Sequence, residues 1–251
     1  MERAFEELLD EAAAAPMQGW DFSWLDGRAS EQRPSWGYQR LMSARLKTAT
    51  AALDIQTGGG EVLAEAETFP QTMVATESWP PNIAKATALL HPRGAVVVAD
   101  PDEPPLPFAD AAFDLVTSRH PITIRWDEIA RVLQSGGTYL AQHVGPASVF
   151  ELVEYFLGPQ PEARRGRHPD DEAADAETAG LQILDLRTER LRMQFNDIGA
   201  VVYFLRKVVW VVPGFTVDEH LDRLRLLHNQ IQQQGPFIAH SARTLIEATK
   251  L

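Results

Sequence analysis

One glycine-rich segment offers a ligand site built from backbone groups. Residues 53–61 read LDIQTGGGE, in which an apolar run ends at Ile55 and a helix is expected to begin near Glu61. Glycine lets the backbone pass close to a ligand and adopt positive φ, and the first turn of a helix leaves N–H groups without partners. This combination suits a nucleotide-like ligand that lies across the strand ends of an open α/β sheet.

Two common nucleotide motifs do not fit this segment. A dinucleotide fingerprint, G-x-G-x-x-G, could begin at Gly58 and Gly60, but Leu63 stands where its third glycine belongs. A P-loop needs Gly-Lys-Ser/Thr at its end, and no lysine closes this turn. The glycines therefore predict a different kind of nucleotide-like ligand.

The segment resembles the first motif of the class I S-adenosylmethionine-dependent methyltransferases, an acidic residue followed by G-x-G-x-G. Asp54, Gly58 and Gly60 match that motif, and Gln56 replaces its first glycine. The resemblance implies that the backbone of this turn lies close to S-adenosylmethionine. Gln56 affects only how closely the backbone can approach the cofactor at that residue. Asp54 can also be interpreted as a strand-end acid that caps the N–H groups of the loop.

Other parts of the family pattern follow in order. Glu77 ends a second apolar run, and in the resemblance an acid there accepts hydrogen bonds from both ribose hydroxyls. Counting back from the Leu-Pro-Phe of residues 106–108 places Asp102 at the acid that receives the adenine amino group, with Asp100 as second choice. The residues that the resemblance assigns to the cofactor are Asp54, Ile55, Gln56, Thr57, Gly58, Gly60, Glu77, Ser78, Asp102, Glu103, Ser118, Arg119 and His120.

Catalysis of methyl transfer depends on alignment of the acceptor, exclusion of water and, in some cases, removal of a proton. His120 follows the fourth expected strand and is the candidate general base, because the ordinary pKa of a histidine lies near physiological pH. Alternatively, Ser118, Arg119 and His120 only shape the methionine end of the cofactor pocket. His143 is a weaker candidate. The Asn/Asp-Pro-Pro-Tyr/Phe signature of amino-methylating members is replaced by SRHP, which disfavours methylation of adenine or glutamine amides.

The elements that must position these residues alternate as in a parallel sheet wrapped by helices. Apolar runs typical of buried strands lie at 51–55, 72–76, 95–99, 113–118 and 138–144, and further strands are expected at about 181–194 and 240–249. Helices are expected at about 2–15, 38–49, 61–68, 81–90, 125–133, 198–210 and 216–233. With the resemblance, this pattern predicts an α/β, Rossmann-like fold: a seven-stranded, mostly parallel sheet whose last strand is antiparallel.

The expected domains are an N-terminal helical and aromatic lid, residues 1–50, and an S-adenosylmethionine-binding methyltransferase domain, residues 51–251. Within the second, residues 158–178 are rich in Pro, Gly and charged residues and are interpreted as a mobile loop. Residues 197–236 form a helical insertion before the last strand. Two aromatic groups could form the acceptor pocket: Trp20, Trp24, Trp36 and Tyr38 in the lid, and Tyr203 and Trp210 in the insertion.

Composition narrows the classes of partner. The formal net charge is −12, which disfavours binding of a polyanion such as RNA or DNA. Arg164, Arg165 and Arg167 are followed at once by an acidic run, so that stretch is interpreted as a solvated loop. There is no cysteine, and no His/Asp/Glu cluster shows metal-binding spacing, so no metal is expected. No run is long enough to span a bilayer and no secretory signal is evident, which favours the cytoplasm.

These observations predict S-adenosylmethionine-dependent methyl transfer to a small-molecule acceptor. Two other readings stay open: a non-catalytic protein that binds the same cofactor in a regulatory role, and an RNA or protein methyltransferase. Gln56 and the absence of an obvious base favour the first of these, whereas the acidic charge disfavours the second. The sequence indicates neither the acceptor atom nor the oligomeric state.

Overall fold

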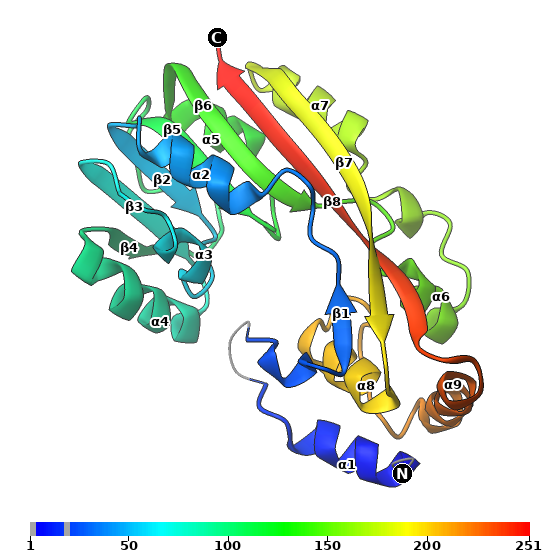
Figure 1. Cartoon of the computed structure of the whole chain (residues 1–251). Coiled ribbons are helices and arrows are strands. Elements are labelled where there is room, and N and C mark those ends of the chain that lie inside the picture. The colour runs from blue at the N-terminus through cyan, green and yellow to red at the C-terminus, as the bar shows by residue number, and fades with distance from the viewer. Residues whose placement is uncertain (1–3, 18–20) are drawn as a thin grey trace. The chain divides into compact units, whose positions relative to one another are not determined.

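The computed structural model describes residues 4–17 and 21–251, and its described strands form one mixed sheet (Figure 1). The strand order is β1-β7-β8-β6-β5-β2-β3-β4. The strands are β1 Ala29–Glu31, β2 Ala51–Ile55, β3 Thr72–Glu77, β4 Val96–Ala99, β5 Phe113–Arg119, β6 Leu133–Val144, β7 Leu181–Phe195 and β8 Phe237–Lys250. The pairs β2–β3, β2–β5, β3–β4 and β5–β6 are parallel, and β8 is antiparallel to β6. The Rossmann-like α/β prediction is therefore confirmed, with the short β1 as an additional strand.

The helices also follow the expected order. They are α1 Phe5–Ala14, α2 Tyr38–Leu46, α3 Glu61–Ala64, α4 Pro80–Leu90, α5 Trp126–Val132, α6 Phe150–Leu157, α7 Pro169–Thr178, α8 Ile198–Lys207 and α9 Leu221–Gln234. Every helix expected from the sequence is present, although α3 and α9 are shorter than expected. Helices α6 and α7 were not expected. Among the described residues, no helix combines the length and the apolar character needed to cross a bilayer.

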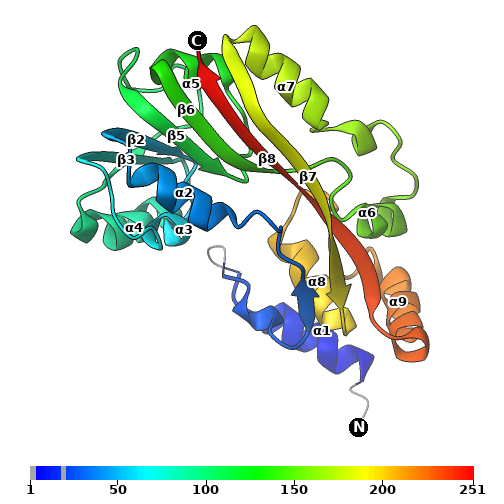
Figure 2. The ribbon, with the colours of Figure 1, turned by 45° about the horizontal axis from the view of Figure 1, so that its top comes forward.

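The expectation of a mobile loop over 158–178 is wrong for its second half, because α7 occupies Pro169–Thr178. Proline at the first helical position and acids in the first turn both favour a helix start. The His168 ring accepts a hydrogen bond from the backbone N–H of Asp170, which caps the helix. Ala176 is buried, and α7 runs beside the first half of β7 (Figure 2). The breaker-rich loop is thus confined to residues 158–168.

The chain divides into two compact units. The first unit comprises Pro34–Gly145, Arg167–Glu189 and Arg243–Leu251. We call it the motif unit, since all the predicted cofactor residues lie within it. The accessory unit comprises the described part of Met1–Arg33 together with Pro146–Gly166 and Arg190–Ala242. The division falls at residues 33 and 34, whereas the sequence suggested a boundary at residue 50.

The side chains of α2 explain this difference. Tyr38, Met42 and Leu46 are buried, and with Trp36 they belong to a hydrophobic cluster that includes Leu140 of the sheet. Trp36 and the buried face of α2 are therefore part of the core of the motif unit. Whether any part of the N-terminal segment acts as a lid stays a prediction, and Trp20 lies outside the described residues.

In the accessory unit, one residue from each of the two expected aromatic regions packs against the other. Trp24 stacks on Tyr203 of α8 with ring centroids 4.7 Å apart, and α1 packs along α8. Tyr203 is buried, whereas Trp210 is about half exposed. At least Trp24 and Tyr203 thus serve the packing of this unit.

The parallel strands of the motif unit carry one hydrophobic cluster on each face. Leu53, Val116 and Tyr139 belong to a cluster with residues of α5 and α7, whereas Leu115 and Leu140 belong to a cluster with residues of α2, α3 and α4. Neighbouring residues of one strand point to opposite faces, so continuous apolar runs such as 51–55 are what a sheet covered on both faces requires.

Candidate functional site

The carboxyl ends of four parallel strands meet at one edge of the sheet. Asp54 pairs in register with Thr117 of β5, and Ile55 pairs with Ser118. On the other side of β2, Glu77 at the end of β3 lies opposite Ala99 of β4. The structure therefore brings the predicted cofactor residues of β2, β3 and β5 to one place, where open α/β sheets bind their ligands.

The turn after β2 needs left-handed backbone at three positions. Gln56, Gly58 and Gly60 have φ values of 55°, 65° and 81°. A Cβ on Gly60 would lie 2.9 Å from the side chain of Leu90, so glycine is also required for the close approach of α3 to α4. Gln56 adopts the left-handed backbone conformation, which is unfavourable for residues that have a Cβ atom. Glycine has no Cβ and would adopt it without strain.

The Gln56 side chain makes two bonds that glycine could not make. Its Nε2 donates to the carbonyl oxygen of Thr123 over 2.8 Å, and its Oε1 accepts from the backbone N–H of Ile122 over 2.6 Å. Gln56 therefore ties the glycine-rich turn to the loop that follows β5.

Glu77 organises the same turn from the neighbouring strand. Its Oε2 accepts from the Gly58 N–H over 2.7 Å, and its Oε1 accepts from the N–H groups of Ser78 and Trp79 over 3.1 and 2.9 Å. A carboxylate offers about four acceptor positions. Three are used here, so Oε2 alone keeps a position for a ligand hydroxyl, and binding of both ribose hydroxyls stays a prediction. Ser78 itself lies exposed beside this carboxylate.

Asp54 is buried between β2 and β5. Its Oδ1 accepts a hydrogen bond from the Thr117 hydroxyl over 2.6 Å. Burial raises the pKa of Asp54 from its usual 3.8 to about 6, against the opposing effect of the hydrogen bond from Thr117. The N–H groups of the turn have other acceptors, including Glu77. Glu77, not Asp54, is therefore the acid that caps the loop.

The region of Asp102 contains buried polar atoms without partners. Asp100 is almost fully buried and accepts from Arg125 Nη2 over 2.8 Å, and Asp102 Oδ1 lies 3.8 Å from the same nitrogen. Asp102 Oδ1 and Arg125 Nη1 are both buried without a hydrogen-bond partner. Leaving such groups unpaired costs about 1–3 kcal/mol each. A ligand edge with both a donor and an acceptor, such as adenine, would satisfy them, so these residues fit the expected cofactor. Glu103 is exposed nearby.

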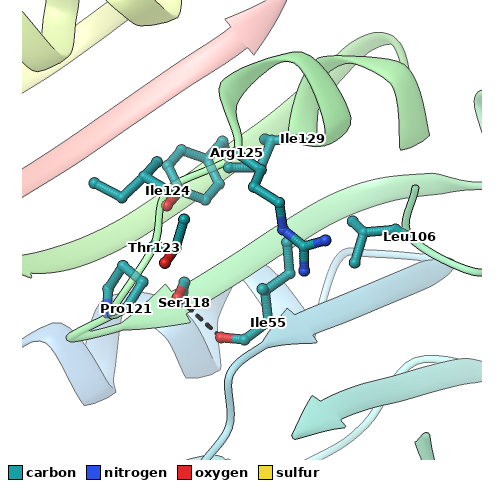
Figure 3. Close-up of a pocket in the computed structure, with 9 residues that line it drawn as sticks. Ile55, Leu106, Ser118, Pro121, Thr123, Ile124, Arg125 and Ile129 are labelled. Carbon is teal, nitrogen blue, oxygen red and sulfur yellow. Dashed lines mark hydrogen bonds between the residues drawn. The ribbon is translucent and has the colours of Figure 1, made fainter. Parts of the chain in front are cut away.

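Ser118 links the end of β5 to β2 and α2. Its hydroxyl donates to the carbonyl oxygen of Ile55 over 2.9 Å (Figure 3), and its own carbonyl accepts from the Tyr38 hydroxyl over 3.0 Å. Arg119, next along the strand, is exposed. Ser118 therefore holds the strand end in place through its backbone and side chain.

His120 is held by an amide whose orientation can be assigned. Trp36 Nε1, which can only donate, lies 2.9 Å from Gln142 Oε1, so Gln142 Nε2 is the donor that lies 3.0 Å from His120 Nε2. His120 Nε2 must then be the unprotonated nitrogen. Burial, with Arg119 and Arg243, holds the pKa of His120 well below its usual 6.5. His120 is thus neutral with its lone pair engaged, and a role as general base stays a prediction.

The loop after β5 closes over a small cavity, shown in Figure 3. Its volume is about 10 Å³, which is room for about one water molecule. The lining residues are Ile55, Leu106, Ser118, Pro121, Thr123, Ile124, Arg125, Ile129 and Tyr139. Arg125 points from the start of α5 into the space between Ile55 and Leu106. A ligand larger than water requires this loop to move.

A buried polar network lies on the α5 side of the sheet. His143 is fully buried, with Nδ1 2.8 Å from Glu172 Oε2 and Nε2 3.0 Å from the Tyr139 hydroxyl. His143 is the weaker catalytic candidate from the sequence, and the motifs do not indicate its partners Glu172 and Tyr139 or the role of Arg125. The signal for Glu172 was available, because His168 and Pro169 followed by three acids are typical of a helix start. Among the described residues, no group of three metal-binding side chains lies close enough to hold an ion.

Comparison with known proteins agrees with this arrangement. Residues 53–141 match the family described as a methyltransferase domain. No curated protein sequence matches the chain.

Solved structures of low sequence identity share the fold. A candidate methyltransferase from Bacillus halodurans C-125 is 20% identical, with a TM-score of 0.62, over 86% of this chain and 99% of that one. Haemonchus contortus phosphoethanolamine N-methyltransferase 2, in complex with phosphomonomethylethanolamine and S-adenosylhomocysteine, is 17% identical, with a TM-score of 0.51. The match covers 99% of this chain and 60% of that one. A methyltransferase from Geobacter sulfurreducens in complex with S-adenosylhomocysteine is 13% identical, with a TM-score of 0.51, over 85% and 90%.

Proposed function

We propose that the chain is a class I S-adenosylmethionine-dependent methyltransferase that transfers the methyl group to a small-molecule acceptor, as its methyltransferase domain at residues 53–141 and its fold support. When bound, the cofactor supplies an electrophilic methyl group on a sulfonium sulfur. The protein therefore has to bind this group, orient the acceptor and keep water away.

We assign the binding of the cofactor to the turn of residues 54–60, to Glu77 and to Asp102, with Ser118–His120 at the methionine end. The observation that carries this assignment is that Asp102 Oδ1 and Arg125 Nη1 are both buried without a hydrogen bond, at the strand edge where Glu77 holds the turn. Glu77 Oε2 is available for a ribose hydroxyl, and the loop of residues 121–125 closes over the site.

The acidic charge supports a small-molecule acceptor. With a net charge of −12, the chain repels RNA, whose binding rests on neutralisation of phosphates by basic side chains. A second arginine-containing stretch comprises Arg187, Arg190 and Arg192. Arg164 of the first stretch is paired with Glu154, and Arg190 of the second is paired with Glu151, so each stretch has at least one arginine that is already neutralised.

A methyl-labelling experiment tests this function. The purified chain is incubated with S-adenosylmethionine that carries a labelled methyl group and, separately, with a library of small molecules, with total RNA and with denatured protein extract. We expect label in a small-molecule product, formed together with S-adenosylhomocysteine, and slower transfer by Glu77→Ala. Label recovered only in RNA or only in protein would contradict the proposed acceptor class.

A further inference from the structure

A second and larger hollow lies in the motif unit, between the loop after β5 and helix α7. Its volume is about 340 Å³, which is enough for a small organic molecule. Ile124 and Trp126 supply its apolar wall, and α7 supplies Asp171, Glu172 and Asp175. None of these five residues is among the predicted cofactor contacts.

The charge of the lining is acidic. Its three carboxylates face one guanidinium, that of Arg167, which also lines the hollow and donates to the carbonyl oxygen of Ile122 over 2.6 Å. His168 also lines the hollow, and its Nδ1 accepts a hydrogen bond from the backbone N–H of Asp170. The lining favours a cation over an anion.

Glu172 gives a separate indication of a ligand. Its side chain is 8% exposed, and its Oε2 lies 2.8 Å from His143 Nδ1. Its Oε1 is buried and has no hydrogen-bond partner. A carboxylate oxygen left without a donor in a buried place is costly, and a donor from a ligand in the hollow would satisfy it.

Trp126 adds an aromatic ring to the lining. Its ring is largely buried, and it is held edge-on against Tyr139 with ring centroids 5.5 Å apart. The face of an indole attracts an ammonium group, most strongly where water is excluded. A tryptophan beside carboxylates is a combination that suits an amine or a quaternary ammonium group.

The hollow also adjoins the candidate cofactor site. Thr123 and Ile124 line both the hollow and the small cavity that contains Ile55 and Ser118. Gln56, in the glycine-rich turn, is bonded to the backbone of this same loop. We propose that the hollow binds the amine or ammonium group of the methyl acceptor, an inference that rests on the proposed small-molecule function.

Binding of charged and uncharged probes tests the hollow. Titration calorimetry on the full chain compares choline, which carries a trimethylammonium group, with its uncharged carbon analogue 3,3-dimethylbutan-1-ol. Choline should bind at least tenfold more tightly than the analogue, and benzoate should not bind. Asp175→Asn, which changes an exposed residue and leaves the buried network alone, should weaken choline at least tenfold. Glu172→Gln, which removes a negative charge from the lining, should do the same.

Glu177→Gln is the matched control, because Glu177 is an exposed acid on the same helix that does not line the hollow. It should leave choline binding unchanged. Equal affinities of Asp175→Asn and Glu177→Gln for choline, or equal binding of choline and its analogue, would overturn the inference.

The failure of this inference can be told apart from the failure of the proposed function. If the labelling experiment yields a small-molecule product and Asp175→Asn uses that acceptor with the KM of Glu177→Gln, the function stands and the inference falls. If choline binding depends on Asp175 but label enters only RNA or protein, the function falls, and with it the assignment of the hollow to the acceptor.

Discussion

Replacement of Asp54 by asparagine tests how a buried carboxyl at the end of β2 affects stability. Asp54 is 6% exposed, and burial raises its pKa from 3.8 to about 6. Asparagine has nearly the same shape, and its side-chain oxygen can still accept the hydrogen bond from Thr117. The substitution therefore removes the charge and keeps the geometry.

The sign follows from proton binding. Because the folded state keeps the proton on Asp54 to higher pH than the unfolded chain does, the folded state binds more protons between pH 4 and pH 6. The contribution of Asp54 to the free energy of unfolding is therefore highest at low pH and falls as pH rises through this window. A difference of about two pH units corresponds to about 3 kcal/mol in full, of which about 2 kcal/mol is lost between pH 4 and pH 6.

Denaturant unfolding of the wild type and Asp54→Asn at pH 4, 5, 6 and 7.5 measures this effect. Other carboxyls, such as Glu128, have lowered pKa values and act in the opposite direction, so the difference between the two proteins is the informative quantity. Relative to the wild type, Asp54→Asn should gain about 2 kcal/mol between pH 4 and pH 6. Glu65→Gln, which neutralises an exposed acid, should show no such trend. Parallel profiles for the wild type and Asp54→Asn would refute the reasoning.

Three further outcomes are expected. Gln56→Gly should bind S-adenosylhomocysteine more tightly in calorimetry, because it frees the loop after β5 and relieves the positive φ; weaker binding would show that Gln56 contacts the ligand. Glu77→Ala should bind S-adenosylhomocysteine at least tenfold more weakly, since a charge-assisted hydrogen bond contributes about 1.5–3 kcal/mol. Unchanged affinity of a folded Glu77→Ala variant would show that Glu77 does not contact the cofactor. Trypsin should cut first at Arg164 or Arg165, which are exposed, whereas Glu-specific protease should spare Glu172; rapid cleavage at Glu172 would contradict helix α7.

The fold was largely predictable because its sheet is buried on both faces. Continuous apolar runs such as 51–55 and 113–118 are typical of inner strands, and the glycines after 51–55 mark a turn. The boundary of the N-terminal segment was less accessible. Nothing in the polar sequence of α2 shows that Tyr38, Met42 and Leu46 face the sheet, because an amphipathic helix does not reveal its partner.

The candidate site divides in the same way. Residues on motif strands, such as Glu77 and Asp102, could be assigned from their position in the pattern. What they contact could not, because the partners of Asp102 and of His143 come from Arg125 and Glu172, far away in the chain. Glu172 lies in a stretch whose composition suggests disorder, and its burial depends on the packing of α7 against the sheet. Composition reports the average polarity of a segment, whereas burial depends on which residues share one helix face.

Gln56 shows how a departure from a motif can be interpreted physically. Glycine at this position costs nothing at positive φ, whereas glutamine pays for that backbone with strain. The strain is offset by two hydrogen bonds to the loop after β5, and these bonds hold the loop over the small cavity. The same loop supplies Ile124, and Trp126 follows it, so movement of this loop would alter the small cavity and the acidic hollow together. We therefore expect that the substitution which frees the loop, Gln56→Gly, also changes the affinity for choline.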